Sequence, residues 1–196
     1  EGLANMASAL FDEGAGDMPA LAFQTRLEEL AISISFSADK DNFHVNLRTL
    51  SKNREEAMWL LGLALNQPRF DDLAVERIRG QILTGLENDR ENPDSIAGRT
   101  WFKIMFGDHV YGRTSRGTKQ SVGRISRDDI KHFAESRFSR DNVIIGAVGD
   151  IDINELARLV DMALWPLPAS SASVDVPEVI PNSRGSITVI RKPNSQ

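Results

Sequence analysis

The chain of 196 residues contains no cysteine. Disulfide bonds, thiol nucleophiles and zinc sites built on cysteine are therefore excluded for this sequence. The absence of cysteine does not indicate whether the protein works in an oxidising or a reducing compartment. The hydrophobic runs are too short to cross a bilayer as a helix. With 41% hydrophobic and 26% charged residues, the remaining composition is that of an ordinary globular domain.

Positive charge is scarce relative to negative charge. Lys and Arg together number 23 against 28 Asp and Glu, which gives a formal net charge of -5. Binding to a nucleic-acid backbone calls for a clustered basic surface. Nucleic acid is therefore not the partner that this charge balance favours.

Only three histidines are present, and each has a simpler interpretation than catalysis. His132 and Glu135 share a helix face, but no third metal ligand is identifiable nearby, so a solvated surface is favoured. His44 alternates away from the apolar positions of an expected strand and is expected at the surface. His109 lies in a Gly-Asp-His-Val-Tyr-Gly loop, where hydrogen bonding is favoured over chemistry.

Hydrophobic periodicity predicts an α+β fold in which an antiparallel sheet is covered on one face by helices, because helices outnumber strands and the strands do not alternate regularly with them. Asn53 with Glu56, and Ser126 with Asp129, are spaced as capping boxes that start helices. Leu73 is expected on the inward face of a long helix. The expected elements are helices 2–12 and 19–30, a hairpin of strands 31–38 and 42–50, helices 53–65, 71–89, 93–106 and 126–138, a buried strand 142–149, a helix 152–163 and a strand 186–192.

Five stretches of sequence recur in one known family in the same order. Residues 2–15 read Gly-Leu-Ala-Asn-Met-Ala-Ser-Ala-Leu-Phe-Asp-Glu-Gly-Ala. The others are Leu-Glu-Glu-Leu-Ala-Ile-Ser-Ile-Ser at 27–35, Gln-Pro-Arg-Phe at 67–70, Gly-Asp-His-Val-Tyr-Gly-Arg at 107–113 and Asp-Asn-Val-Ile-Ile-Gly-Ala-Val-Gly-Asp at 141–150. Together they resemble the pitrilysin/insulinase-type zinc metallopeptidases, which include mitochondrial processing peptidase. The resemblance spans most of the chain and implies the half-subunit fold of that family.

The resemblance also implies that the zinc chemistry has been lost. In the family, Gly-Leu-Ala leads into a helical His-x-x-Glu-His, in which two histidines bind zinc and the glutamate activates water. Asn5, Ser8 and Ala9 occupy those three positions here, and none of them replaces a neutral imidazole or a general base. The third ligand of the family falls at about Gly85, with Glu87 two residues away as the nearest carboxylate. We therefore predict no catalytic residue and no metal or other cofactor in this chain, and expect zinc in an active partner.

The resemblance implies three segments. A peptidase-like domain covers residues 1–166 and lacks the strands that normally precede the motif helix, so the chain is interpreted as a fragment of a longer precursor. Residues 167–185 form a linker rich in Pro and Ser, and residues 186–196 are the truncated first strand of a following homologous domain. The strand at 187–190 is expected to dock on an edge of the sheet or to swap into a neighbouring copy.

By the same resemblance, the function is that of an inactive peptidase-like domain. It is expected to form a heterodimer with an active sister subunit, or to join a second lobe, and so to complete a chamber that binds peptide. Arg113, Arg116 and the edge of the strand at 31–38 are the candidate substrate contacts. A bacterial periplasm or cell envelope is favoured over the cytoplasm. Two alternatives stay open: an active zinc endopeptidase with ligands from outside this segment, and a purely structural subunit similar to the core proteins of respiratory complexes.

Overall fold

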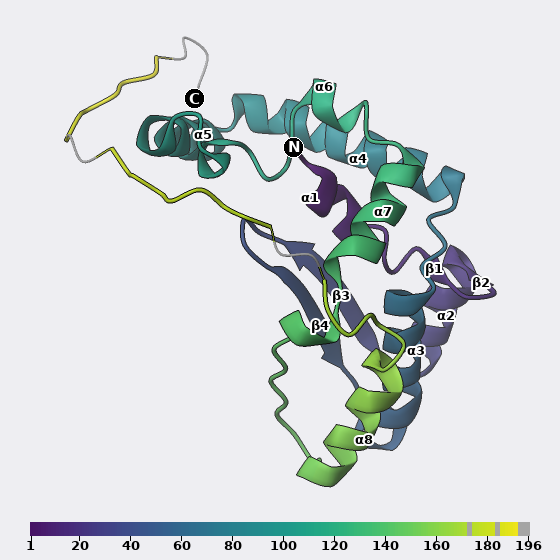
Figure 1. The fold of residues 1–196 in the computed structure, drawn as a ribbon. Coiled ribbons are helices and arrows are strands. Elements are labelled where there is room, and N and C mark those ends of the chain that lie inside the picture. The colour runs from purple at the N-terminus through teal and green to yellow at the C-terminus, as the bar shows by residue number, and fades with distance from the viewer. Residues whose placement is uncertain (172–173, 183–184, 192–196) are drawn as a thin grey trace.

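A computed structural model describes residues 1–171, 174–182 and 185–191 (Figure 1). The expected α+β class is confirmed, since the described residues form a helix-rich fold with two small antiparallel sheets. The elements are α1 (Leu3–Ser8), β1 (Gly14–Ala15), β2 (Met18–Pro19), α2 (Ala20–Glu29), β3 (Ser33–Ala38), β4 (Phe43–Arg48), η1 (Ser51–Asn53), α3 (Arg54–Asn66), α4 (Asp72–Glu91), α5 (Pro93–Phe106), η2 (Val110–Gly112), α6 (Lys119–Val122), α7 (Arg127–Arg137), η3 (Arg140–Asn142) and α8 (Ile153–Leu164).

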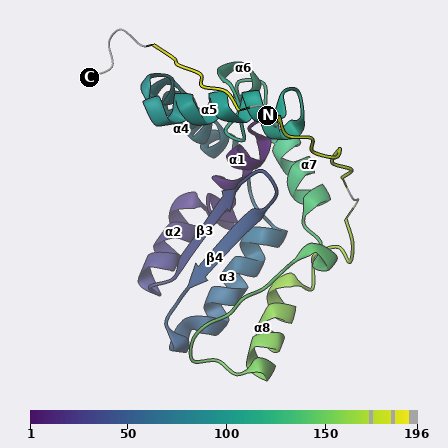
Figure 2. The same cartoon turned by 90° about the vertical axis from the view of Figure 1, so that its left-hand side faces the viewer.

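The predicted hairpin is confirmed as β3 and β4, paired from Ser33 with Arg48 to Ala38 with Phe43. Ile34 is 7% exposed on the face that packs toward α2 and α3, because alternate side chains of a strand point to one side. Figure 2 shows α2 and α3 behind the hairpin. The sheet is thus covered by helices on one face, as the alternation predicts.

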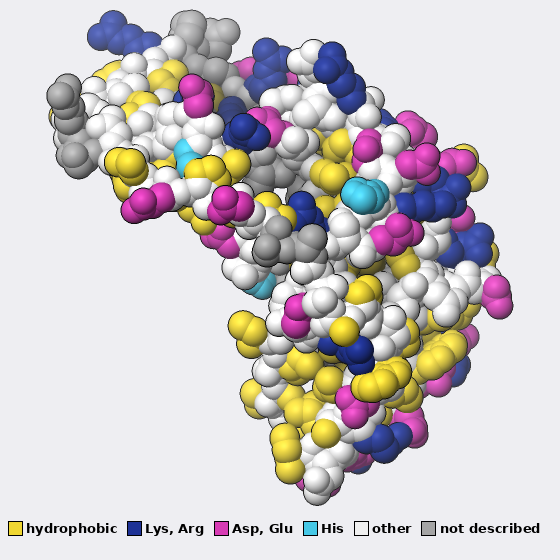
Figure 3. Space-filling view, viewed as in Figure 1, with side chains coloured by type: hydrophobic (Ala, Val, Ile, Leu, Met, Phe, Trp, Pro, Cys, Tyr) yellow, Lys and Arg dark blue, Asp and Glu magenta, His cyan; other side chains and the backbone are white. Residues whose placement is uncertain are grey.

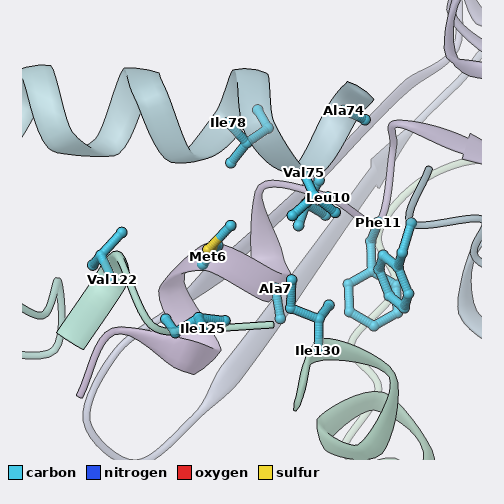
Figure 4. Packing of buried hydrophobic residues seen from close by; sticks show 11 residues of the cluster. Met6, Ala7, Leu10, Phe11, Ala74, Val75, Ile78, Val122, Ile125 and Ile130 are labelled. Atoms are coloured by element: carbon cyan, nitrogen blue, oxygen red, sulfur yellow. The ribbon is translucent and has the colours of Figure 1, made fainter. Parts of the chain in front are cut away.

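Two hydrophobic clusters hold the fold together. The first joins α1, α4, α6 and α7, and the second lies between the hairpin, α2 and α3. Phe36 and Leu65 pack against both clusters and so connect them. The buried residues of the first cluster, drawn as sticks in Figure 4, are Met6, Ala7, Leu10, Phe11, Phe70, Ala74, Val75, Ile78, Val122, Ile125 and Ile130.

Helices α3 and α8 pack unusually close together. A Cβ built on Gly62 would lie 2.9 Å from the Cα of Ala163, so a side chain at this position would meet backbone. The amide of Asn66 donates to the carbonyl of Ala163 at 2.9 Å across the same contact. Glycine at position 62 therefore allows α8 to lie directly on α3.

One of the two predicted capping boxes is confirmed. The Ser126 hydroxyl accepts from the Asp129 amide at 3.1 Å, and the Asp129 carboxylate accepts from the Ser126 amide at 2.8 Å. The prediction for Asn53 and Glu56 is wrong, because the Asn53 side chain makes no capping bond. Its amide nitrogen donates instead to the carbonyl of Leu30 at 2.6 Å.

The inward placement predicted for Leu73 is also wrong. Leu73 is 88% exposed, whereas Ala74 and Val75 beside it are 7% and 3% exposed. Successive residues of a helix are rotated by about 100° around its axis. With Ala74 and Val75 facing the core, Leu73 lies on the opposite, solvent-exposed face. Ile78, also expected inward, is 6% exposed.

The buried strand predicted at 142–149 is not formed. Residues 143–148 make no backbone hydrogen bond among the described residues, and Ile144 is 99% exposed. Figures 1 and 2 place this extended segment on the side of α3 and α8 that the hairpin also covers. A strand requires a hydrogen-bonded neighbour, and no described segment lies in register with this one.

The strand expected at 186–192 is likewise absent over 186–191, where Ile187 is 95% exposed, and Lys192 lies outside the described residues. Docking or swapping of this segment stays a prediction, as do the three segment boundaries. Among the described helices, none combines the length and the apolar character that crossing a bilayer requires.

Candidate functional site

The helix at the start of the chain lies at the centre of the first cluster. Met6, Ala7, Leu10 and Phe11 point from α1 and the turn after it into the core, where α4 and α7 meet them (Figure 4). These apolar positions recur at helical spacing, which is why the sequence folds as a helix here. The packing role of α1 is therefore intact.

The polar side of α1 does not provide zinc ligands. The Ser8 hydroxyl is buried and donates to the carbonyl of Asn5 at 2.9 Å. Asn5 offers only an amide, Ala9 offers no donor atom, and zinc prefers imidazole, thiolate or carboxylate. Across the described part of the chain, no group of three or more His, Asp or Glu residues is placed to hold a metal ion. The residues present at the motif positions do not fit zinc.

Gly85, at which the resemblance places the third motif position, lies on α4, and an arginine occupies the space beside it. A Cβ built on Gly85 would lie 2.9 Å from Nη2 of Arg116. The Arg116 guanidinium donates to the Asp89 carboxylate, one turn further along α4, and the Asp89 side chain is 20% exposed. Ser95 of α5 donates to the same carboxylate at 3.3 Å. Sequence reasoning missed this contact, because nothing in the local sequence relates Arg116 to Gly85.

Glu87, the nearest alternative ligand, does not turn toward α1. Its carboxylate accepts from Arg90 at 3.3 Å on the exposed face of α4. The helical spacing of three residues accounts for this pair. Glu87 is therefore a surface residue in the described structure.

The two candidate arginines of the loop have different surroundings. Arg116 is engaged with Asp89, whereas Arg113 lies within electrostatic reach of Asp108. Lys103 is the main cause that holds the pKa of Asp108 below its ordinary value. A substrate role for either arginine stays a prediction.

Each histidine is found in the setting that the sequence favoured. His109 accepts from the Tyr111 amide at 3.1 Å through Nδ1, and its Nε2 lies 3.0 Å from the carbonyl of Pro177. His44 is exposed, and its Nε2 lies 2.8 Å from Oδ2 of Asp39. The His44 hydrogen bond is the largest cause that lowers the pKa of Asp39, followed by backbone donors. The hydrogen bonds from the Ser126 amide and hydroxyl are the main causes that lower the pKa of Asp129, and the nearby His132 adds to them. His132 belongs to no metal group among the described residues.

The tip of the hairpin is fastened to the loop after α5. Lys40 donates to the carbonyls of Tyr111 at 2.9 Å and Arg113 at 2.7 Å, and its ammonium lies 4.5 Å from the centre of the Phe102 ring. The Tyr111 hydroxyl donates to Asp41 at 2.5 Å. Partial burial lowers the pKa of Lys40. Sequence reasoning missed this clasp, although a Lys between two Asp residues in a turn is a signal for a specific contact.

β3, whose edge is the third candidate for substrate contact, contacts α1. Among the described strands only β4 pairs with β3, so the other edge of β3 has no strand partner there. β3 and α1 are therefore neighbours, and an edge without a strand partner is what peptide binding by strand addition requires.

Comparison with known proteins yields a consistent set of matches. The family described as "Peptidase M16 inactive domain" matches residues 124–196. The "Non-peptidase homolog YmxG" of Helicobacter pylori is 27% identical over 171 residues, which is 87% of this chain and 40% of that protein. The chain thus spans less than half of this relative.

Solved structures show the same fold. A peptidase M16 inactive domain from Pseudomonas fluorescens superposes with a TM-score of 0.85 at 27% identity, over 91% of this chain and 44% of that chain. The periplasmic protease PqqL from Escherichia coli superposes with a TM-score of 0.77 at 18% identity, over 90% of this chain and 20% of that chain.

Proposed function

We propose that this chain serves as an inactive domain of the pitrilysin/insulinase-type zinc metallopeptidase family, and that it completes a peptidase-like chamber beside a lobe or subunit that carries the metal. The observation that carries the proposal is the combination of an intact α1 core with motif positions that offer no zinc ligand. Packing is kept where it holds the scaffold, while the catalytic side chains are gone.

Exposed apolar surface supports the idea of a missing neighbour. In Figure 3 hydrophobic side chains gather over the lower half of the molecule, where α3, α8 and the segment before α8 lie. Ile144, Ile153 and Trp165 are 99%, 74% and 69% exposed in this region. Large apolar patches on soluble proteins mark surfaces that another chain or lobe covers.

Among the α-helices of the described residues, only α5 contains no buried residue. Helix α5 has 14 residues, none of which is buried, although Trp101 and Ile104 on it are 52% and 37% exposed and apolar. A helix of this composition is stable mainly through packing against a partner. Both surfaces are consistent with one half of a larger assembly.

Substrate contact and location are further parts of the proposal. We infer that an extended peptide pairs with the edge of β3, and that Arg113 or Arg116 attracts its acidic groups. A periplasmic or cell-envelope location is supported by the fold shared with PqqL, which is a periplasmic protease. Fractionation of the source cells, with a periplasmic marker enzyme as reference, tests that location.

Reconstitution tests the central proposal. The chain is mixed with a sister subunit that has an intact His-x-x-Glu-His motif, and cleavage of a fluorogenic peptide is compared with that of each protein alone. We expect no zinc and no cleavage from this chain alone, and a higher rate from the mixture than from the sister subunit. As the matched control, exchanging the motif glutamate of the sister subunit for glutamine should abolish the rate of the mixture.

Two outcomes count against the proposal. Zinc-dependent cleavage by this chain alone would mean that it has a catalytic site of its own. A mixture no faster than the sister subunit, together with elution as separate species on size exclusion, would remove the proposed partnership.

A further inference from the structure

Arg116 contacts the chain at two places, just before the motif helix α1 and at Gly85 on α4. The backbone carbonyl of Arg116 lies against the start of α1, where a Cβ built on Gly2 would come within 3.0 Å of it. The side chain of the same residue crosses to α4, where Nη2 lies 2.9 Å from a Cβ position at Gly85. Arg116 therefore contacts both the residue that precedes α1 and the side-chain position of Gly85 on α4, while its own side chain is 47% exposed.

The guanidinium is held in place. Asp89 accepts from Arg116 Nη1, and the Asp89 side chain is largely buried while it also receives the Ser95 hydroxyl. A guanidinium stays protonated at every accessible pH. Its positive charge at this position is therefore permanent, and the ion pair with Asp89 holds it in place.

A fixed cation at this place opposes a divalent metal in two ways. Like charges a few ångströms apart repel, and water weakens this repulsion only in part because the Arg116 side chain is 47% exposed. In addition, a carboxylate introduced at position 85 would start next to Nη2 and would pair with the guanidinium instead of the metal. The family position is thus altered beyond the simple loss of its ligands.

We propose that Arg116, anchored by Asp89, acts as a plug that excludes divalent metal from the vacated site. Its role is independent of any partner subunit and follows from the contact between Arg116 and Gly85. Restoring the ligands is not sufficient to restore metal binding while the plug is present.

Metal titration of ligand-restored variants tests this proposal. The first variant carries Asn5→His, Ala9→His and Gly85→Glu, and the second adds Arg116→Leu. Binding of Zn²⁺ is measured by calorimetry, and binding of Co²⁺ by its visible absorption. We expect the second variant to bind Zn²⁺ roughly 10- to 100-fold more tightly than the first. Mutating residues that contact the metal ligands changes metal affinity by this factor in natural sites.

Two further variants serve as controls. One distinguishes the charge of Arg116 from the volume of its side chain, and the other tests whether losing any nearby arginine changes metal binding. Arg116→Lys in the ligand-restored background retains the positive charge and should remain a weak binder. Arg124→Leu in that background removes an arginine from the same exposed segment, away from Gly85, and should change nothing. Circular dichroism verifies that each variant is folded.

The proposal is overturned if the first variant binds as tightly as the second, or if neither binds, since Arg116 would then not be what excludes the metal. If the three substitutions prevent folding, the pair Asn5→His and Ala9→His alone is compared with and without Arg116→Leu. An equal affinity for Co²⁺ in that pair leads to the same rejection.

Discussion

Replacing Phe11 by alanine should measure how far the apolar core alone maintains this scaffold. The Phe11 side chain is fully buried, and its ring lies 5.2–5.4 Å from four other rings, those of Phe36, Phe43, Phe70 and Phe138. Removing a buried phenylalanine side chain costs about 3–5 kcal/mol. Edge-on ring pairs add roughly 0.5–1.5 kcal/mol beyond burial, so we expect the upper part of that range, about 4–5 kcal/mol.

Such a loss is a large share of the roughly 5–15 kcal/mol that stabilises a typical domain. The assay is urea unfolding followed by far-ultraviolet circular dichroism, with the slope of the transition checked for constancy. Phe11→Leu keeps most of the apolar volume but loses the ring contacts, and should cost about 1.5 kcal/mol. Leu73→Ala removes a side chain of similar size that is 88% exposed, and should stay within about 0.5 kcal/mol.

The reasoning is refuted if Phe11→Ala costs no more than Leu73→Ala. That result would mean that the aromatic cluster around α1 is not what holds the motif helix in place. Unfolding of the unsubstituted protein when a metal chelator is added, seen as a loss of its circular dichroism signal, would lead to the same conclusion.

Three other changes test local interactions. Asn53→Asp keeps an equally good helix-capping residue but loses the donor to the carbonyl of Leu30, so it should destabilise the fold by about 1–3 kcal/mol in urea unfolding, whereas a capping role alone predicts no change. His44→Ala should raise the pKa of Asp39 toward its ordinary value, as measured by carboxyl NMR titration; because that pKa is lowered in the folded chain, the pair stabilises at neutral pH and its contribution is lost on acidification. Lys40→Ala should speed hydrogen exchange in residues 107–113, because the clasp between the hairpin and that loop is removed.

Each of these three predictions has an outcome that would contradict it. A neutral Asn53→Asp would restore the capping interpretation, and an unchanged carboxyl titration would mean that backbone donors alone control Asp39. Unaltered exchange at 107–113, with α7 as the internal reference, would show that the clasp carries no stability.

Local sequence patterns determined most of the elements of this protein. The alternation in the hairpin, the Ser126 capping box and the proline that starts α5 each act through neighbours within a few residues. The same holds for the vacated motif, since the residue types at Asn5, Ser8 and Ala9 decide by themselves that no zinc ligand is present.

Only the tertiary structure decided the remaining features, because they depend on contacts between distant residues. The segment at 143–148 has the composition of a buried strand, yet strand formation depends on a neighbour that its own sequence does not specify. The Asn53 side chain could accept a hydrogen bond from an amide at the start of α3 or donate one to the carbonyl of Leu30. It donates to Leu30 because the end of α2 lies close to it in the folded chain. Arg116 reaches Gly85 across 31 positions of sequence, and only the folded chain shows that its guanidinium lies against that glycine.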